Sequence, residues 1–280
     1  MDGYKFVLDV SHHQTFNYDE VKKHIDGVII RFGFGTLADR MADKHYDGFK
    51  EIPCAGYQWF RPDQDVKAQI ELIKVKTSGK DVEVFFSDNE QQGPYQSSGG
   101  YSPTYLSEAA RAHVEGLSLH GFDMGIYTRA TWVDSYARPM WNWMFKYHNW
   151  LASWPFASGA VTTSWETLKS YWSPKIFSPY FTSDWPTDKR KADVWQWSGD
   201  KFIVPGIFTS TGKPRSSDFN FVSNELFERF EESTPTPTPD PLPLPVDTES
   251  RLRVLEEKVS IAQTDIDRIE NVMRGHGLPI

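Results

Sequence analysis

Two acidic side chains, Asp88 and Glu90, follow closely on an apolar segment, Val82–Phe86, that predicts a buried strand. Side chains alternate along an extended chain, so the two carboxyl groups point the same way from Cα atoms about 7 Å apart. Crowded carboxylates raise one another's pKa, so one of them can stay protonated near neutral pH. Such a pair could protonate a leaving oxygen and stabilise a cationic centre, which is the chemistry that glycosidic cleavage needs.

Two further acids occupy comparable positions. Asp9 closes the first apolar segment of the chain, and Asp218 belongs to the last. Active sites of β/α barrels lie at the carboxyl ends of the strands, and the first, fourth and eighth strands can face one barrel mouth. The sequence therefore predicts a pocket of four acids. We expect Glu90 to donate the proton because its side chain is longer and has three acids nearby, and Asp88 to be the stabilising carboxylate.

Other interpretations of these acids stay open. An Asp-x-Glu at the end of a strand is often no more than a pair of surface carboxylates. The acids could also ligate a metal ion with help from His12, His13 and His45. Neither spacing nor ligand type favours a particular metal, so we predict no metal and no cofactor. The single cysteine, Cys54, lies in an apolar stretch, which indicates a buried and inert thiol.

Eight short apolar segments before residue 223 predict the strands that position the acids. They are Tyr4–Asp9, Val28–Phe32, Pro53–Phe60, Val82–Phe86, Met124–Thr128, Trp150–Ser153, Val194–Ser198 and Asp218–Val222. Between several of them lie stretches of helical length: Asp19–His24, Ala38–Lys50, Asp63–Ser78 and Ser102–His120. Alternating strands and helices with nearly continuous apolar strands favour a parallel sheet. Eight such strands indicate a closed β/α barrel, irregular between residues 130 and 220, where helical patterns are scarce.

The composition changes abruptly after Phe230, which ends the predicted barrel of residues 1–230. Residues 231–250 form a linker with proline at every second position from 235 to 245, a pattern typical of an extended spacer. Residues 251–275 carry apolar side chains at alternating spacings of three and four. These are Leu252, Leu255, Val259, Ala262, Ile266, Ile269 and Met273. The pattern predicts a coiled-coil helix through which the chain self-associates, since an isolated helix of this length is marginal in water. A helix that folds back on the barrel is the alternative.

Charge and composition exclude several function classes. The 280-residue chain has a formal net charge of −8, whereas a nucleic-acid partner would favour a basic face. Aromatic residues make up 15% of the chain; packing explains most of them, and a cleft that stacks sugar rings would explain a minority. The sequence contains no run of 18 apolar residues, so it predicts no insertion into a membrane. The amino-terminal residues lack the features of a signal peptide, so we expect synthesis in a cytoplasm.

Seven short pieces of the sequence resemble, in order, motifs of glycoside hydrolase family 25, the lysozymes of phage endolysins, bacteria and some fungi. They are Asp9–Gln14, Gly56–Phe60, Asp88–Glu90, Gly125–Thr128, Trp150–Trp154, Trp195–Ser198 and Asp218–Phe221. Each is unspecific alone, but seven in order are hard to obtain by chance. The resemblance implies an irregular eight-stranded β/α barrel that cleaves the β-1,4 bond between N-acetylmuramic acid and N-acetylglucosamine in peptidoglycan.

By position, the resemblance implies that Glu90 is the general acid. It implies that Asp88 either stabilises the transition state or orients the substrate's own acetamido group, and it leaves open whether the nucleophile is Asp88, that group or water. The residues expected to bind substrate are Asp9, Asp218, Tyr57, Tyr127, Trp197, Gln196 and Asn220. Gln58 stands where many relatives have a histidine, so no role of that histidine is carried over.

The expected function is therefore that of a peptidoglycan hydrolase for phage-mediated lysis of a bacterial host. We expect it to reach the wall through holin pores or as part of a virion. Its expected partners are peptidoglycan strands and, through residues 251–275, copies of itself. The alternative is a virion-associated structural protein whose barrel binds or lyses the wall.

Overall fold

The structure is a computed structural model that describes residues 4–93, 100–156, 159–170 and 192–231. The predicted coiled coil, and the predicted linker apart from residue 231, lie outside the described residues and stay predictions. No helix within the described ranges is long and apolar enough to cross a membrane.

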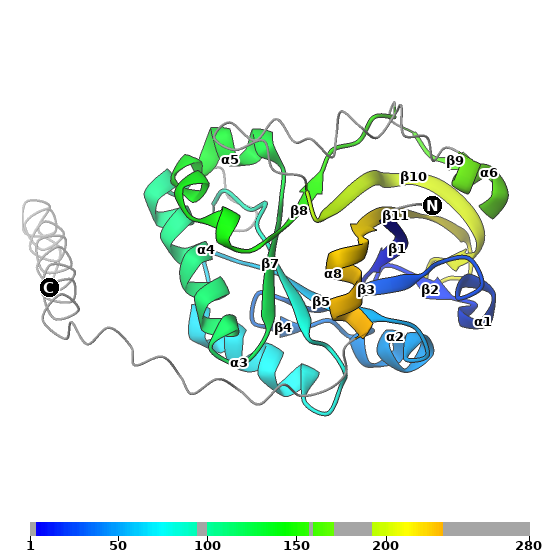
Figure 1. Cartoon of the computed structure of the whole chain (residues 1–280), viewed down its shortest axis with the longest axis horizontal. Coiled ribbons are helices and arrows are strands. Elements are labelled where there is room, and N and C mark those ends of the chain that lie inside the picture. The colour runs from blue at the N-terminus through cyan, green and yellow to red at the C-terminus, as the bar shows by residue number, and fades with distance from the viewer. Residues whose placement is uncertain (1–3, 94–99, 157–158, 171–191, 232–280) are drawn as a thin grey trace, which may run out of the picture. The chain divides into compact units, whose positions relative to one another are not determined.

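Eight strands close into a barrel with helices outside it (Figure 1). They are β1 (Tyr4–Val10), β3 (Gly27–Phe34), β5 (Cys54–Trp59), β6 (Val84–Asp88), β7 (Asp123–Thr128), β8 (His148–Ala152), β10 (Val194–Phe208) and β11 (Pro214–Ser223). From β1 to β10 each strand runs parallel to the next, and β11 pairs with both β10 and β1 to close the ring. All eight predicted strands are present, and the expected eight-stranded barrel is confirmed.

The expectation of a wholly parallel sheet is wrong for β11, which runs antiparallel to both neighbours. The physical reason is the short connection between β10 and β11. A tight turn returns the chain beside the strand it has just left, whereas a parallel neighbour needs a crossover connection. The turn is held by a hydrogen bond from Thr209 N to Lys213 O of 2.7 Å, and Gly212 adopts a φ of +79° within it. As a result, Asp218 faces Asp9 across the β1–β11 ladder and does not stand at a carboxyl end.

Shorter elements complete the fold. Three two-residue strands extend the sheet: β2 (Thr15–Phe16) and β9 (Val161–Thr162) pair with β10, and β4 (Leu37–Ala38) pairs with β3. The α-helices are α1 (Tyr18–Val21), α2 (Ala42–Phe49), α3 (Val66–Thr77), α4 (Pro103–Ser118), α5 (Ala130–Tyr136), α6 (Trp165–Ser170) and α8 (Asn224–Glu231). The 3₁₀ turns η1 (Arg138–Asn142) and η2 (Met144–Lys146) follow α5, so the irregular later part is also found.

Helix α4 illustrates how the local sequence sets an element. The Ser102 side chain accepts a hydrogen bond from Tyr105 N at 3.2 Å and caps the helix, and Pro103 occupies the first turn, where a missing N–H costs nothing. Three- and four-residue spacing then turns one stripe of side chains inward: Leu106, Ala110, His113, Val114 and Leu117 are all buried.

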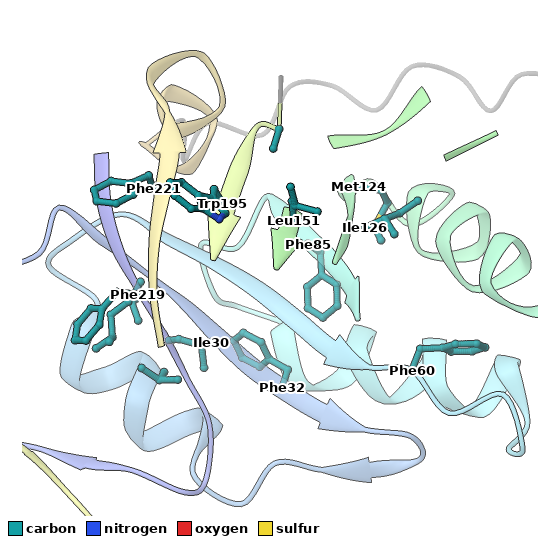
Figure 2. Close-up of a cluster of buried hydrophobic side chains, with 14 of the residues drawn as sticks. Ile30, Phe32, Phe60, Phe85, Met124, Ile126, Leu151, Trp195, Phe219 and Phe221 are labelled. Carbon is teal, nitrogen blue, oxygen red and sulfur yellow. The ribbon is translucent and has the colours of Figure 1, made fainter. Parts of the chain in front are cut away.

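Strand alternation divides the apolar side chains into two clusters. One set projects outward and packs under the helices, and Figure 2 shows members of it, including Phe32, Phe85 and Ile126. The other set fills the barrel interior, with Val84, Phe86, Tyr127 and Trp150 among its members. Helix α8 adds its apolar face to this interior cluster through Leu226, Phe227 and Phe230. Helix α8 therefore covers the interior cluster near the amino ends of the strands.

Candidate active site

An open pocket of about 140 Å³ lies at the carboxyl ends of the parallel strands. Its wall contains all four of the predicted acids, Asp9, Asp88, Glu90 and Asp218. They arrive from three elements: Asp9 from β1, Asp218 from β11, and the other two from the end of β6 and the residues after it. The structure thus brings together carboxyl groups that are more than 200 residues apart in the chain.

The backbone at the end of β6 explains why Asp88 and Glu90 face the same side. Asn89 continues the ladder, because its N–H donates to Tyr127 O at 2.9 Å and its carbonyl accepts from Thr128 Oγ1 at 2.9 Å. The Asn89 side chain turns back to Ser87, donating to its carbonyl at 2.8 Å. With the intervening residue fixed in this way, the two acids on either side of it both reach the pocket.

A series of hydrogen-bonded side chains lies behind the end of β6. Ser87 Oγ hydrogen-bonds His113 Nδ1 at 2.8 Å, and His113 Nε2 hydrogen-bonds Gln58 Oε1 at 2.7 Å. Gln58 in turn donates from Nε2 to Gly35 O at 2.7 Å. Gln58 is fully buried on the outward side of β5, away from the pocket wall. The residue that departs from the family pattern is therefore part of the support behind the site.

Asp9 is held by two side-chain amides. Its Oδ2 accepts hydrogen bonds from Asn220 Nδ2 at 2.7 Å and from Gln196 Nε2 at 3.1 Å. Burial raises the pKa of Asp9 from 3.8 to about 7, and these hydrogen bonds oppose part of that rise. Asp9 can thus carry a proton close to neutral pH.

The orientation of the two amides is itself fixed by aromatic donors. Tyr127 OH and Trp154 Nε1 donate to Gln196 Oε1 at 3.1 and 3.2 Å. Trp150 Nε1 donates to Asn220 Oδ1 at 2.8 Å. An amide whose oxygen is already accepting must present its NH₂ group, so these contacts aim both donors at Asp9. Asn220 therefore acts from behind the pocket wall, while Gln196 and Tyr127 also line it.

The acids after β6 are perturbed in the same direction. Burial, followed by the charge of Glu90, raises the pKa of Asp88 well above its ordinary value, and Asp88 Oδ1 has no hydrogen-bond partner among the described residues. Burial also raises the pKa of Glu90, against the charge of Arg129, whose Nη2 lies 3.7 Å from Glu90 Oε2. The pair therefore holds a proton at a higher pH than isolated carboxylates would. That is the state a proton donor requires.

Asp218 completes the acidic wall. Burial raises its pKa well above the ordinary value, and the charge of Asp9 adds to the rise. Its Oδ1 accepts a hydrogen bond from Asp200 N at 2.5 Å. Asp200 has a φ of +48°, an uncommon conformation for a residue with a side chain, so the backbone there is bent to supply this donor.

Arg31 is a buried cation in the pocket wall. Arg31 on β3 is 5% exposed, and its Nε donates to Asp39 Oδ2 at 2.8 Å. It also contacts His12 Nδ1 and lies close enough for its charge to lower the pKa of Asp88. Arg31 therefore favours the ionised form of Asp88 against the effects of burial and of Glu90.

Not every residue expected at the pocket lies there. Tyr57 and Tyr127 do line it, but Trp197 does not. Trp197 is 1% exposed and packs in the outer cluster, stacked on Phe221 with ring centroids 5.4 Å apart. Gln196 points inward, so by strand alternation its neighbour must point outward.

Sequence reasoning missed several residues of the wall: Ser11, Arg31, Trp59, Trp150, Asp200 and Arg215. For Arg31 a signal existed, since a charged residue inside an apolar strand needs a partner or a function. Trp150 and Trp59 also stand in quoted motifs. For Asp200 and Arg215 the sequence offered no comparable signal.

Of the histidines considered as metal ligands, His13 lines the pocket, whereas His12 and His45 do not. His45 Nδ1 hydrogen-bonds Tyr18 OH at 3.0 Å, and His45 Nε2 hydrogen-bonds Ser11 O at 3.0 Å. Within the described part of the chain, no group of three or more His, Cys, Asp or Glu side chains is arranged to hold a metal ion. Cys54 is buried, and burial raises the pKa of its thiol, in agreement with an inert role.

Comparisons with known proteins add information on the fold. No protein-family model and no curated protein matches the sequence. Among solved structures, the chain is similar to the bacterial lysozyme from Streptomyces coelicolor, with a TM-score of 0.58, 18% identity, and coverage of 82% of this chain and 98% of that one. It is also similar to the catalytic domain of endolysin ply40 from bacteriophage P40 of Listeria monocytogenes (TM-score 0.57, 17% identity, coverage of 82% and 98%). A family GH25 lysozyme from Aspergillus fumigatus gives a TM-score of 0.57 at 20% identity, with coverage of 81% and 98%. The chain shares the fold of these enzymes.

Proposed function

We propose that this chain is a family 25 glycoside hydrolase that acts as an N-acetylmuramidase. One observation carries the proposal: four carboxyl groups with raised pKa values converge in one pocket at the open end of a barrel. Burying several acids together is costly, and it is common where their protonation states are used for catalysis. The shared fold with lysozymes and an endolysin catalytic domain supports the same reaction class.

In the proposed reaction, Glu90 protonates the glycosidic oxygen as the bond to the leaving sugar breaks. Its side chain is 16% exposed, so it can reach a bound substrate, and burial raises its pKa, which favours the protonated form. Asp88, with its partner-free Oδ1 and with Arg31 favouring its ionised form, stabilises the positive charge that develops on the sugar. The nucleophile is Asp88, the substrate's acetamido oxygen or water. Glu90 then takes up the proton released when water completes hydrolysis.

Asp9 and Asp218 serve the same step differently. Both are buried acids with raised pKa values, and Asp9 is held by two amide donors. In the proposal they bind and orient the polar groups of the sugar next to the bond that breaks. Tyr57, Tyr127 and Gln196 form the wall against which that sugar rests.

The substrate proposed is the β-1,4 bond between N-acetylmuramic acid and N-acetylglucosamine in the bacterial wall. The biological setting proposed is phage-mediated lysis, and the fold shared with a Listeria phage endolysin supports it. A virion-borne form of the same enzyme would use the same pocket.

Mass spectrometry of a digest of purified peptidoglycan tests the proposal. We expect muropeptides that end in a reducing N-acetylmuramic acid with one water added, and Glu90→Gln as the control should produce none. Products with a 1,6-anhydro end would indicate transglycosylation, and released stem peptides would indicate cleavage of an amide bond. Either result, or the absence of products from the wild-type chain, would contradict the proposed reaction.

A further inference from the structure

Arg215, near the start of β11, is a cation in the wall of the acidic pocket that forms no ion pair with any of its acids. Its Nε is buried and has no hydrogen-bond partner in the described part of the chain. The other two arginines nearby each have an acidic partner. Arg31 donates to Asp39, and Arg129 Nη2 lies 3.7 Å from Glu90 Oε2, although Arg129 Nε, like Arg215 Nε, has no hydrogen-bond partner among the described residues. A buried donor without an acceptor is unfavourable, so an arrangement of this kind indicates a partner from outside the chain.

The chemistry of the side chain restricts that partner. A guanidinium is always charged at physiological pH, has five donors and no acceptor, and its planar fork matches the two oxygens of a carboxylate. A sugar hydroxyl would also accept a hydrogen bond, but the bond to a carboxylate is charge-assisted and stronger. The partner that Arg215 fits best is therefore an anionic group on the ligand.

The neighbours of Arg215 permit an anion to approach. Asp218 lies close enough to feel its charge, but burial raises the pKa of Asp218 well above the ordinary value, which favours the neutral form of this acid. His13 lines the same side, and burial, helped by His12, lowers its pKa to about 4, which leaves a neutral imidazole. Asp200 is the remaining acid on this side, and its Oδ1 accepts a hydrogen bond from Ser216 Oγ at 3.3 Å.

We propose that Arg215 binds a carboxylate of the glycan and makes the pocket selective for carboxylate-bearing amino sugars over neutral ones. The inference rests on the proposed function, since it names the feature of the substrate that the pocket recognises. In peptidoglycan the carboxylate has two sources: the lactyl group of N-acetylmuramic acid where it carries no peptide, or the stem peptide attached to it. The side chain acts in binding and takes no part in proton transfer.

Calorimetric titration of the full chain carrying Glu90→Gln tests this without turnover. Two ligands carry carboxylates: a tetrasaccharide of alternating N-acetylglucosamine and N-acetylmuramic acid, and the same compound with stem peptides. Two are neutral: the tetrasaccharide with its lactyl groups converted to methyl amides, and tetra-N-acetylglucosamine. We expect a carboxylate-bearing ligand to bind about 10- to 100-fold more tightly than the neutral ones. Adding Arg215→Gln should remove that preference and leave binding of the neutral ligands unchanged. The carboxylate-bearing ligand that loses more affinity on Arg215→Gln identifies the source of the carboxylate.

Lys213→Gln is the matched control, because it removes an exposed positive charge two residues away that does not line the pocket. It should leave the preference intact. If Lys213→Gln and Arg215→Gln reduce binding equally, the effect is one of general charge and the inference is wrong. If charged and neutral glycans bind equally to the chain that retains Arg215, the inference is wrong while the proposed function stands. If no glycan binds at all, both are overturned.

Discussion

The two ends of the barrel hold their charged side chains in opposite ways. At the closed end, around the amino ends of β7 and β8, Asp123 lies between a histidine and an arginine: its Oδ1 is 3.1 Å from His148 Nε2, and its Oδ2 is 3.2 Å from Arg229 Nε. Arg229 also pairs with Glu83. Burial alone would raise the pKa of Asp123, but these partners bring it below its ordinary value. Charges at this end are paired, as in a part of the molecule that only has to be stable.

At the open end the acids outnumber the cations, and burial raises the pKa of every acid of the predicted quartet. Asp88 Oδ1 and Arg215 Nε have no partner among the described residues. Unpaired buried atoms of charged side chains destabilise a fold, so a chain that keeps them at the open end has a use for them there. The difference in pairing thus marks the functional end of the barrel more sharply than the presence of acids does.

Asp88→Asn tests the comparison between the two ends of the barrel. After the loss of Glu90, it should have the largest effect on lytic activity. An amide keeps the shape but removes the negative charge, so lysis of purified cell walls should fall about 10³-fold. Thermal unfolding at pH 7 should show equal or higher stability, because a buried carboxylate with a raised pKa is replaced by a neutral group. A stability loss as large as that from a core cavity would show that Asp88 is structural.

Asp9→Asn gives a pH-dependent effect of known sign. The pKa of Asp9 is raised from 3.8 to about 7, so the folded protein keeps a proton that the unfolded chain releases. This contribution to stability is complete below about pH 4 and is lost as the pH rises through about 7. Between pH 5 and pH 8 the wild type should therefore lose about 3 kcal/mol of unfolding free energy relative to Asp9→Asn. Urea titrations across this range measure it, and parallel curves for the two proteins would refute the raised pKa.

Arg229→Met addresses the closed end and should have the smallest effect. Its side chain is 38% exposed, so solvent screens part of its interactions, and we expect a loss of about 1 kcal/mol with unchanged lytic activity. The control is Arg111→Met, which breaks a more exposed pair with Glu115 on α4 and should cost less than about 0.5 kcal/mol. An activity loss beyond the change in folded fraction would show that the closed end takes part in function.

The sequence predicted the strands well because each one is a short apolar run bounded by polar or turn residues. It did not predict that β11 runs antiparallel to its neighbours, since apolar content does not distinguish a hairpin connection from a crossover connection. It also ended β10 too early. The predicted segment stops at Ser198, whereas the strand continues to Phe208 through Gly199, Asp200 and Lys201, which resemble a turn. The register shifts in this part of the ladder accommodate them.

The same failure explains why Asp200 and Arg215 were missed at the site. Asp200 lies beyond the predicted end of β10 at Ser198, and Arg215 lies before the predicted start of the last strand. The acids at predicted strand ends could be placed because strand order alone brings them together. Trp197 was expected at the pocket because it belongs to a motif, although alternation from Gln196 places it outside. Positions set by regular geometry were predictable, and positions set by bulges and turns were not.

The most direct test of the account is the rate of cell-wall lysis by Glu90→Gln, measured beside its thermal unfolding. Glutamine fills the same space but has no acidic proton to donate, whereas burial raises the pKa of Glu90 and favours its protonated form. We predict that the rate falls about 10³-fold or more while the unfolding midpoint stays within a few degrees of the wild type. Retention of lysis within about tenfold of the wild-type rate, in a folded variant, would contradict the assignment of Glu90 as the acid.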